Sequence, residues 1–195
     1  MRTVRHDSDV SRLAAIVVAG GRSSRFGSDK LGATVGGTTL VRHSVDAALA
    51  VGATVVVVGP RPDGLPTSVV VVREVPPLSG PYSAVAAGLA AIDPDAELVL
   101  VLAGDLVDPG ALLPALLEAA AGGAEAAVAV DASGRRQPLL AAYRVGPLLG
   151  GVSGVDPSNR AAGELLDGLH VVEVPDDGTH TRDIDTLDDL AAEIP

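Results

Sequence analysis

A short loop near the start of the chain combines glycines with basic side chains. Gly20 and Gly21 directly follow an apolar run, and Arg25 and Lys30 come soon after them. Glycine lets backbone N–H groups approach a phosphate closely, and arginine and lysine add positive charge. The whole chain has 14 Lys and Arg against 25 Asp and Glu, so a local gathering of cations stands out. This glycine loop, residues 19–30, therefore predicts a site for a polyanionic ligand.

Two other segments place carboxylates where they could hold a metal ion. Asp105 follows the apolar run 98–102, and open α/β sheets bind ligands at the carboxyl ends of their strands. Asp183 and Asp185 are two positions apart in an extended stretch, so both carboxylates project to one side. Mg²⁺ takes oxygen ligands, and one or two carboxylates with phosphate oxygens suffice. The alternatives are a turn or cap role for Asp105 and a salt bridge between Asp185 and Arg182.

The hydrophobic pattern predicts the scaffold for these residues. Runs with the length and composition of strands alternate with Ala- and Leu-rich stretches of helical length. The expected strands are 13–18, 54–58, 68–72, 98–102, 126–130 and 170–174, and the expected helices are 39–51, 81–92, 109–121 and 159–166. Runs that are apolar at every position indicate strands buried on both faces, so we expect an open, mostly parallel α/β sheet with helices on both faces. Two apolar runs within 125–143 flank a turn-rich tetrapeptide and predict an antiparallel excursion.

Composition excludes several classes of function. A net charge of −11 and only 2% aromatic residues argue against binding of nucleic acid, and that charge also disfavours an anionic membrane surface. The absence of cysteine excludes disulfides, thiolate zinc sites and a cysteine nucleophile, and it fits a cytoplasmic protein. No apolar run is long enough to span a membrane. We expect a flexible N-terminal segment over 1–12 and one domain over 13–195.

The glycine loop matches neither the P-loop nor the G-x-G-x-x-G dinucleotide motif. From Val18 it runs V-A-G-G-R-S-S-R-F-G-S-D-K. This resembles the signature L-A-G-G-x-S-x-R-x-G-x-D-K of the molybdenum cofactor guanylyltransferase family, a group of nucleotide-sugar pyrophosphorylase-like nucleotidyltransferases. The resemblance implies a single-domain, Rossmann-like sheet of the nucleotide-diphospho-sugar transferase type, and a nucleotidyltransferase domain over 13–195.

The resemblance also implies roles for individual residues. Val18 and Ala19 would lie at the nucleotide, Gly20, Gly21 and Lys30 would bind the triphosphate, and Arg25 would assist at its β and γ phosphates. Asp105 would hold Mg²⁺, and Asp185 would be a second metal or substrate contact. The catalytic residues implied are Lys30, Arg25 and Asp105.

A further stretch of the chain resembles the segment that, in this family, closes over the guanine base and ribose. Its candidates are Glu74, Gly80, Pro81 and Ser83, with Glu74 in place of the more usual Asp. The start of a helix at Gly80-Pro81 would explain part of this stretch equally well.

The acceptor side is implied by two later segments. Q-P-L-L-A-A-Y, which begins at Gln137, resembles a strand that lines the second substrate, and Arg160 resembles an arginine at the start of the next helix. Gln137, Arg160 and Asp183 are therefore the candidate acceptor ligands. An exposed arginine at a helix end is the alternative for Arg160.

The resemblance implies transfer of GMP from GTP to molybdopterin or its molybdenum-loaded form, with Mg²⁺ as cofactor and release of pyrophosphate. Two alternatives remain: a related nucleotidyltransferase that uses CTP or a sugar-phosphate acceptor, and an inactive nucleotide-binding accessory protein. The second is motivated by Gly-Asp-Leu-Val around Asp105, where the family commonly has Cys-Asp-x-Pro. The substrates that the resemblance implies are small molecules. Transient contacts with cofactor-biosynthesis or acceptor proteins are compatible with such substrates. The sequence does not define the oligomeric state.

Overall fold

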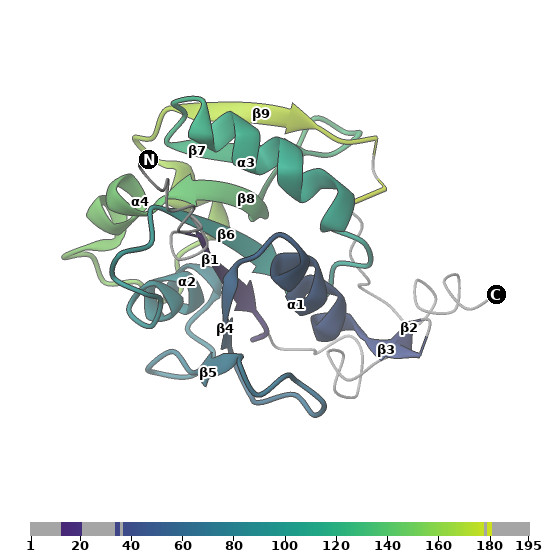
Figure 1. The fold of residues 1–195 in the computed structure, drawn as a ribbon. Coiled ribbons are helices and arrows are strands. Elements are labelled where there is room, and N and C mark those ends of the chain that lie inside the picture. The colour runs from purple at the N-terminus through teal and green to yellow at the C-terminus, as the bar shows by residue number, and fades with distance from the viewer. Residues whose placement is uncertain (1–12, 21–33, 36, 178, 181–195) are drawn as a thin grey trace, which may run out of the picture.

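The computed structural model describes residues 13–20, 34–35, 37–177 and 179–180 (Figure 1). The strands are β1 (Leu13–Val18), β2 (Thr34–Val35), β3 (Thr38–Thr39), β4 (Thr54–Val58), β5 (Val70–Val72), β6 (Leu98–Ala103), β7 (Ala126–Val130), β8 (Arg136–Arg144) and β9 (Val171–Pro175). The α-helices are α1 (Leu40–Ala50), α2 (Pro81–Leu89), α3 (Leu113–Ala121) and α4 (Val145–Val152), and two 3₁₀ helices are η3 (Gly110–Leu112) and η4 (Ala162–Leu166). The predicted flexible segment 1–12 lies outside the described residues.

One sheet of seven strands forms the centre of the domain, in the order β5-β4-β1-β6-β8-β7-β9. Neighbouring strands from β5 to β6 are parallel, and β7 and β9 are parallel to each other. Strand β8 runs antiparallel to both of its neighbours, β6 and β7. The sheet is thus mostly parallel, as predicted, and the expected antiparallel excursion is the β7–β8 pair.

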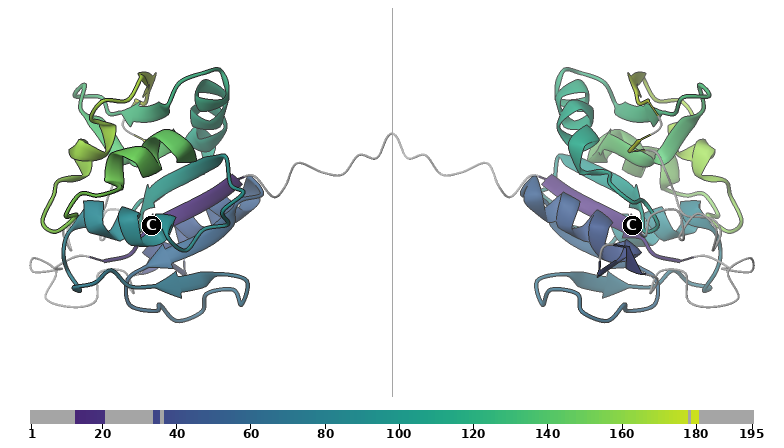
Figure 2. Two further views of the ribbon diagram at one scale, coloured as in Figure 1. Left: turned by 90° about the vertical axis from the view of Figure 1, so that its left-hand side faces the viewer. Right: turned by 90° about the vertical axis from the view of Figure 1, so that its right-hand side faces the viewer.

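The central strands are apolar at nearly every position because both of their faces are covered. On one face, Val17 of β1 belongs to a core with Val45 of α1 and Leu116 of α3. On the other face, Ile16 belongs to a core with Val85 of α2, Leu148 of α4 and residues of η4. Figure 2 shows the helices on both sides of the sheet.

The order of the strands defines a topological switch point. The chain passes from β1 through α1 to β4 and β5 on one side, then returns through α2 to β6 on the other side of β1. Strands β1 and β6 therefore flank the point where the direction of winding reverses. In open α/β sheets, ligands bind outside the carboxyl ends of the strands at this point.

Several elements differ from the sequence prediction. The expected helix 159–166 is only the 3₁₀ helix η4, because Asn159 has φ 59° and Ala161 is extended. The expected helix 109–121 starts as η3 before α3, and the helix expected over 81–92 ends at Leu89. Helix α4 was not predicted, since its sequence contains three glycines and a proline that have low helix propensity.

No helix among the described residues is both long and apolar enough to cross a membrane.

Candidate functional site

The end of β1 is tied to both neighbouring strands. Val18 pairs in register with Ala103 of β6, and its carbonyl accepts a hydrogen bond from Gly104 N at 2.9 Å. Ala19 N donates to the carbonyl of Val58 in β4 at 2.8 Å. Gly20 directly follows the junction made by these two hydrogen bonds, so its backbone begins at a point that is joined to both β4 and β6.

Gly59, the residue after β4, packs against this junction. Its φ is 146°, and a Cβ built there would lie 2.6 Å from the carbonyl oxygen of Ala19. That distance is too short for any side chain, and the obstacle is backbone rather than a movable side chain. Glycine at this position therefore permits the close approach of β4 to the start of the glycine loop.

A buried carboxylate lies beside Gly20. Glu74 is only 5% exposed, and its Oε1 would be 3.6 Å from a Cβ built on Gly20. The same oxygen accepts a hydrogen bond from Leu78 N at 2.9 Å. Glu74 thus joins the stretch that follows β5 to the end of β1, where a buried carboxylate needs such partners.

The stretch from Glu74 to α2 is held by internal contacts. We call it the base-side segment (residues 74–81), after the role that the resemblance implies for it. The hydroxyl of Ser79 donates to the carbonyl of Pro76, and Ser79 is buried. Gly80 is the N-cap residue of α2 with φ 98°, and Pro81 opens the helix. The predicted helix start is therefore confirmed. Ser83 is 3% exposed within α2.

Asp105 lies two residues beyond the end of the register between β1 and β6. The hydrogen bond from Gly104 to Val18 precedes it, and Leu106, 4% exposed and packed in the core, follows it. Ser44 of α1 donates to the carbonyl of Ala103 at 2.7 Å. The Gly-Asp-Leu-Val sequence thus keeps Asp105 at the strand end, because its leucine anchors the turn.

A later segment returns to the same loop. The Nδ1 atom of His180 lies 2.8 Å from the carbonyl oxygen of Asp108, and His180 N donates to the Asp176 carboxylate at 3.0 Å. The chain after β9 therefore reaches the loop that carries Asp105. Asp183 and Asp185 lie outside the described residues.

Gln137 lies at the same edge of the sheet as the ends of β1 and β6. Because β8 is antiparallel to β6 and Leu140 faces Leu102, the first residues of β8 extend beyond the carboxyl end of β6. The Gln137 side chain donates to the Asp131 carboxylate at 2.7 Å. It is thus oriented by the turn between β7 and β8.

Asp131 organises that turn. Its Oδ1 accepts hydrogen bonds from the Ser133 hydroxyl at 2.6 Å, from Ser133 N at 2.9 Å and from Arg135 N at 3.0 Å. These contacts, with the Ser133 hydroxyl first, lower the pKa of Asp131 from 3.8 to about 2. The carboxylate that orients Gln137 is therefore ionised over most of the pH range.

An irregularity in β8 lies next to Gln137. The pairing with β7 shifts between Val128 and Ala129, so that Ala141 pairs with Val128 while Gln137 pairs with Ala129. The hydroxyl of buried Tyr143 donates to the carbonyl of Pro138 at 2.9 Å, and burial raises the pKa of Tyr143. The Q-P-L-L-A-A-Y sequence thus supports a bulge, where proline lacks an N–H for the ladder.

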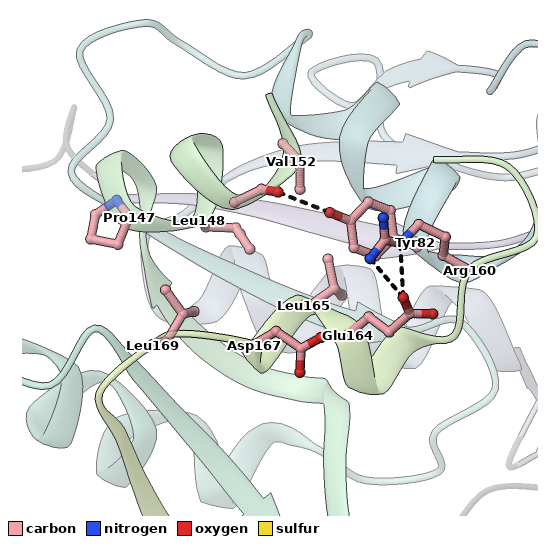
Figure 3. Close-up of a pocket in the computed structure, with 10 residues that line it drawn as sticks. Tyr82, Pro147, Leu148, Val152, Arg160, Glu164, Leu165, Asp167 and Leu169 are labelled. Carbon is pink, nitrogen blue, oxygen red and sulfur yellow. Dashed lines mark hydrogen bonds and ion pairs between the residues drawn. The ribbon is translucent and has the colours of Figure 1, made fainter. Parts of the chain in front are cut away.

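Arg160 is engaged in a cluster on the α2 face of the sheet (Figure 3). Its guanidinium carbon lies 5.0 Å from the centre of the Tyr82 ring. Its Nε and Nη2 lie 2.8 and 2.7 Å from one carboxylate oxygen of Glu164. The hydrogen bond from Ala161 N, followed by the contact with Arg160, lowers the pKa of Glu164. We call Tyr82, Arg160 and Glu164 the Arg160 clamp.

The structure brings together part of the predicted site. Val18, Ala19, Gly20, Glu74 and Asp105 lie on segments that meet where β1, β4 and β6 end, with Gly80, Pro81 and Ser83 at the adjoining start of α2. Gln137 lies at the same edge and Arg160 lies against Gly80.

Gly21, Arg25 and Lys30 lie outside the described residues. Gly59 was not predicted, although a glycine directly after the buried strand β4 is a visible signal. Asp131, Tyr82 and Glu164 were not predicted as site residues either. Asp131 opens the turn-rich tetrapeptide and Glu164 lies four residues after Arg160, whereas no local pattern marks Tyr82.

The fold and this edge define a class: an open α/β domain of the nucleotide-diphospho-sugar transferase type, with its candidate site at the carboxyl ends of β1 and β6. The model of the MobA-like NTP transferase domain matches residues 15–169. The chain belongs to this family of nucleotidyltransferases.

One curated relative is the molybdenum cofactor guanylyltransferase of Sinorhizobium fredii. It is 34% identical over 146 residues, which cover 70% of this chain and 65% of the relative. The match therefore spans slightly less than two thirds of the relative's length.

Solved structures share the fold. Molybdopterin-guanine dinucleotide biosynthesis protein A of Archaeoglobus fulgidus is 20% identical with a TM-score of 0.66, over 92% of this chain and 96% of that one. The manganese complex of Rv0371c from Mycobacterium tuberculosis is 21% identical with a TM-score of 0.70, over 94% and 98%. The 2-C-methyl-D-erythritol 4-phosphate cytidylyltransferase of Thermus thermophilus is 22% identical with a TM-score of 0.67, over 93% and 97%. At these identities the likeness concerns the fold.

Proposed function

We propose that this protein is a metal-dependent guanylyltransferase that transfers GMP from GTP to the terminal phosphate of molybdopterin or its molybdenum-loaded form. The observation that carries the proposal is the joining of β1 and β6 at their carboxyl ends. There the hydrogen bond from Gly104 to Val18 sets the start of the glycine loop next to the turn that carries Asp105. The guanylyltransferase from S. fredii, with 34% identity, supports the choice of reaction.

In this proposal the glycine loop binds the triphosphate. Gly20 and Gly21 offer backbone N–H groups, and Arg25 and Lys30 neutralise the phosphates. The base would lie toward Glu74, since this carboxylate is already beside Gly20. Gly80, Pro81 and Ser83 would complete that side, and Val18 and Ala19 would form the floor.

The donor atoms fit a hard cation. Among the described residues no group of three or more His, Asp or Glu could hold a metal ion by itself. Asp105 supplies a carboxylate at the strand end, which suits Mg²⁺, because that ion takes one or two carboxylates and completes its shell with phosphate oxygens and water. Asp105 would hold Mg²⁺, with Asp185 as a second contact. When bound, the ion neutralises charge on the phosphate oxygens.

The proposed reaction is an in-line displacement. An oxygen of the acceptor phosphate attacks the α-phosphorus of GTP, and the bond from that phosphorus to the bridging oxygen of the β-phosphate breaks. Pyrophosphate leaves with the electron pair of the broken bond, and no covalent enzyme intermediate forms. Lys30 and Arg25 would stabilise the charge on the leaving group. Gln137 and Asp183 would orient the acceptor.

A CTP-dependent or sugar-phosphate nucleotidyltransferase is the second candidate. The cytidylyltransferase from T. thermophilus shares the fold, so the fold is compatible with either base. The test is calorimetric titration with GTP, CTP, ATP and UTP in the presence of Mg²⁺, followed by pyrophosphate release with molybdopterin. Clear preference for CTP would overturn the guanylyltransferase assignment. Tight nucleotide binding without pyrophosphate release would favour the inactive accessory protein.

The metal assignment is tested by Asp105→Asn. Asparagine would hold Mg²⁺ less well, so the ion that neutralises the reacting phosphates would be lost, and the rate of pyrophosphate release should fall by about 10²–10³-fold with an unchanged circular dichroism spectrum. Asp108→Asn, three residues further along the same loop at an exposed position, is the matched control and should retain activity. Undiminished pyrophosphate release by Asp105→Asn would refute the role of Asp105.

A further inference from the structure

The side chain of Arg160 has two partners within the fold. Two of its nitrogens lie within hydrogen-bond distance of one carboxylate oxygen of Glu164, and its guanidinium lies over the Tyr82 ring. The ring is only 2% exposed, and its hydroxyl donates to the carbonyl of Gly151 in α4 at 3.1 Å. Figure 3 shows the guanidinium between the ring and the carboxylate. The arginine therefore lies on a rigid platform that belongs to α2 and α4.

The backbone around Arg160 covers the base-side segment. Asn159 N donates to the carbonyl of Ser79 at 2.6 Å, and a Cβ on Gly80 would lie 3.5 Å from the carbonyl oxygen of Arg160. Asn159 has φ 59°, a conformation in which asparagine is better tolerated than most residues. The turn at 159–160 and the residues before α2 are thus packed backbone to backbone.

The other end of the base-side segment reaches the start of the glycine loop. Leu78 N donates to Glu74, and the Glu74 carboxylate lies against Gly20. A continuous series of contacts therefore leads from Arg160 through Ser79 and Gly80 to Glu74. Each contact in the series is between described residues and has one defined geometry.

The cavity beside the clamp is small. It has a volume of about 70 Å³ and is lined by the clamp itself, by residues of α4, by Leu165 of η4, and by Asp167 and Leu169 after η4. A drug-sized ligand occupies a pocket of roughly 300–1,000 Å³, so a pterin-sized acceptor does not fit there. The guanidinium thus lies beside a space that suits packing rather than an acceptor.

We propose that Arg160 is a positioning residue that, through Tyr82 and Glu164, holds the base-side segment against the end of β1 and so sets nucleotide affinity. This role rests on the proposed function and differs from that of an acceptor ligand. The clamp fixes the start of α2, the start of α2 fixes Ser79 and Gly80, and these fix Glu74 beside Gly20.

The test separates the two substrates. Arg160→Gln, Arg160→Lys and Glu164→Gln should each raise the dissociation constant for the nucleotide roughly 5- to 10-fold in calorimetry, a change of about 1–1.4 kcal/mol. The KM for the acceptor should stay within twofold. Lysine should not rescue, because it lacks the planar fork that pairs with Glu164 and stacks on Tyr82. The double variant Arg160→Gln/Glu164→Gln should be no worse than either single one, since the two side chains act as a unit.

The matched control is Arg42→Gln. Arg42 forms an i,i+4 ion pair with Asp46 on α1, at 2.6 Å and with a similarly exposed side chain, and it does not contact the base-side segment among the described contacts. This variant should leave the dissociation constant for the nucleotide unchanged. An Arg160→Gln protein with raised acceptor KM and unchanged nucleotide affinity, partly rescued by lysine, would overturn the proposal.

Hydrogen exchange provides a readout that does not depend on the proposed function. Arg160→Gln should speed exchange of the Leu78 and Asn159 amides about tenfold, and Arg42→Gln should not. Unchanged exchange at these amides would refute the clamp even if no nucleotide bound. A wild-type protein that binds no nucleotide would refute the proposed function instead, and unaltered affinity in all clamp variants would refute the positioning role.

Discussion

Glu74 sets limits on what can lie beside Gly20. It is buried, and one of its oxygens already accepts a hydrogen bond from Leu78 N. The remaining lone pairs of this side chain can accept further hydrogen bonds, so it suits a base edge rich in N–H donors. Both guanine and cytosine carry such donors, which explains why this residue type alone did not specify the base.

Gly59 leads to a prediction about nucleotide binding. In Gly59→Ala the new Cβ would meet the Ala19 carbonyl at 2.6 Å and force the end of β1 to move. We expect a loss of about 1–3 kcal/mol in unfolding free energy and a rise of roughly tenfold in the nucleotide dissociation constant, measured by urea unfolding and calorimetry. Gly52→Ala is the control, because Gly52 also has positive φ, 82°, but no atom within 4 Å of its Cβ. Equal losses of nucleotide affinity in Gly59→Ala and Gly52→Ala would contradict the role of Gly59 at the end of β1.

Asp131 leads to a prediction about pH. Its pKa of about 2 lies below the ordinary 3.8, so its contribution to stability is fully present above pH 3.8 and is lost as the pH falls toward 2. The stability difference between the wild type and Asp131→Asn should therefore shrink between pH 5 and pH 2. Carboxyl NMR titration should show the low pKa, and Ser133→Ala should raise it. A wild-type midpoint near 4 would refute the hydrogen-bonded arrangement.

At the scale of elements, the contact between α2 and β1 is unusually close. A Cβ on Gly88 of α2 would lie 2.6 Å from Cγ2 of Ile16, which is fully buried. In Gly88→Ala, overpacking should lower the unfolding free energy by about 1–3 kcal/mol. The higher helix propensity of alanine should offset roughly 1 kcal/mol of this loss. Gly150→Ala in α4 has no atom within 4 Å and should instead raise stability by about 0.5–1 kcal/mol. Denaturant unfolding would measure both, and a stabilised Gly88→Ala protein would contradict the packing.

The strands could be predicted from sequence and the irregular helices could not. Strands such as β4, with four valines in a row after Thr54, carry a signal that depends only on burial on two faces. Helix α4 is poor in helix formers and owes its structure to packing of Leu148 and Val152 against the sheet. The helix expected over 159–166 does not begin at Asn159, because the backbone of this residue is held by Ser79, some eighty residues away in sequence.

The residues of the candidate site divide in the same way, into those that could be predicted from the sequence and those that could not. Gly20 and Asp105 were predicted as site residues because each comes just after an apolar strand, and strand ends meet at one edge of a parallel sheet. Glu164 lies four residues after Arg160, a spacing that suits an ion pair, but Tyr82 is far from Arg160 in the sequence and no local pattern marks that contact. Tyr82 was not predicted as a functional residue, whereas in the structure the Arg160 guanidinium lies over its ring.

For the molecule as a whole, ligand binding should be visible as added stability. A ligand at 100 times its dissociation constant stabilises the folded state by about 2.7 kcal/mol, which raises the Tm of a chain of this size by roughly 5–10 °C. We expect this shift with GTP and Mg²⁺ and a smaller one with CTP, ATP or UTP in differential scanning calorimetry. Chelation of the metal with EDTA should abolish most of it. An equal shift with EDTA present would refute metal-dependent binding.

The position of β8 between β6 and β7 bears on how the chain is made. Until residues 136–144 have been synthesised, β6 with its sequence LVLVLA has a partner on only one side, β1. A long, uncharged strand edge is a template for association with other chains. During translation, a parallel half-sheet that forms early would therefore expose an edge able to associate with other chains until the antiparallel strand has been added.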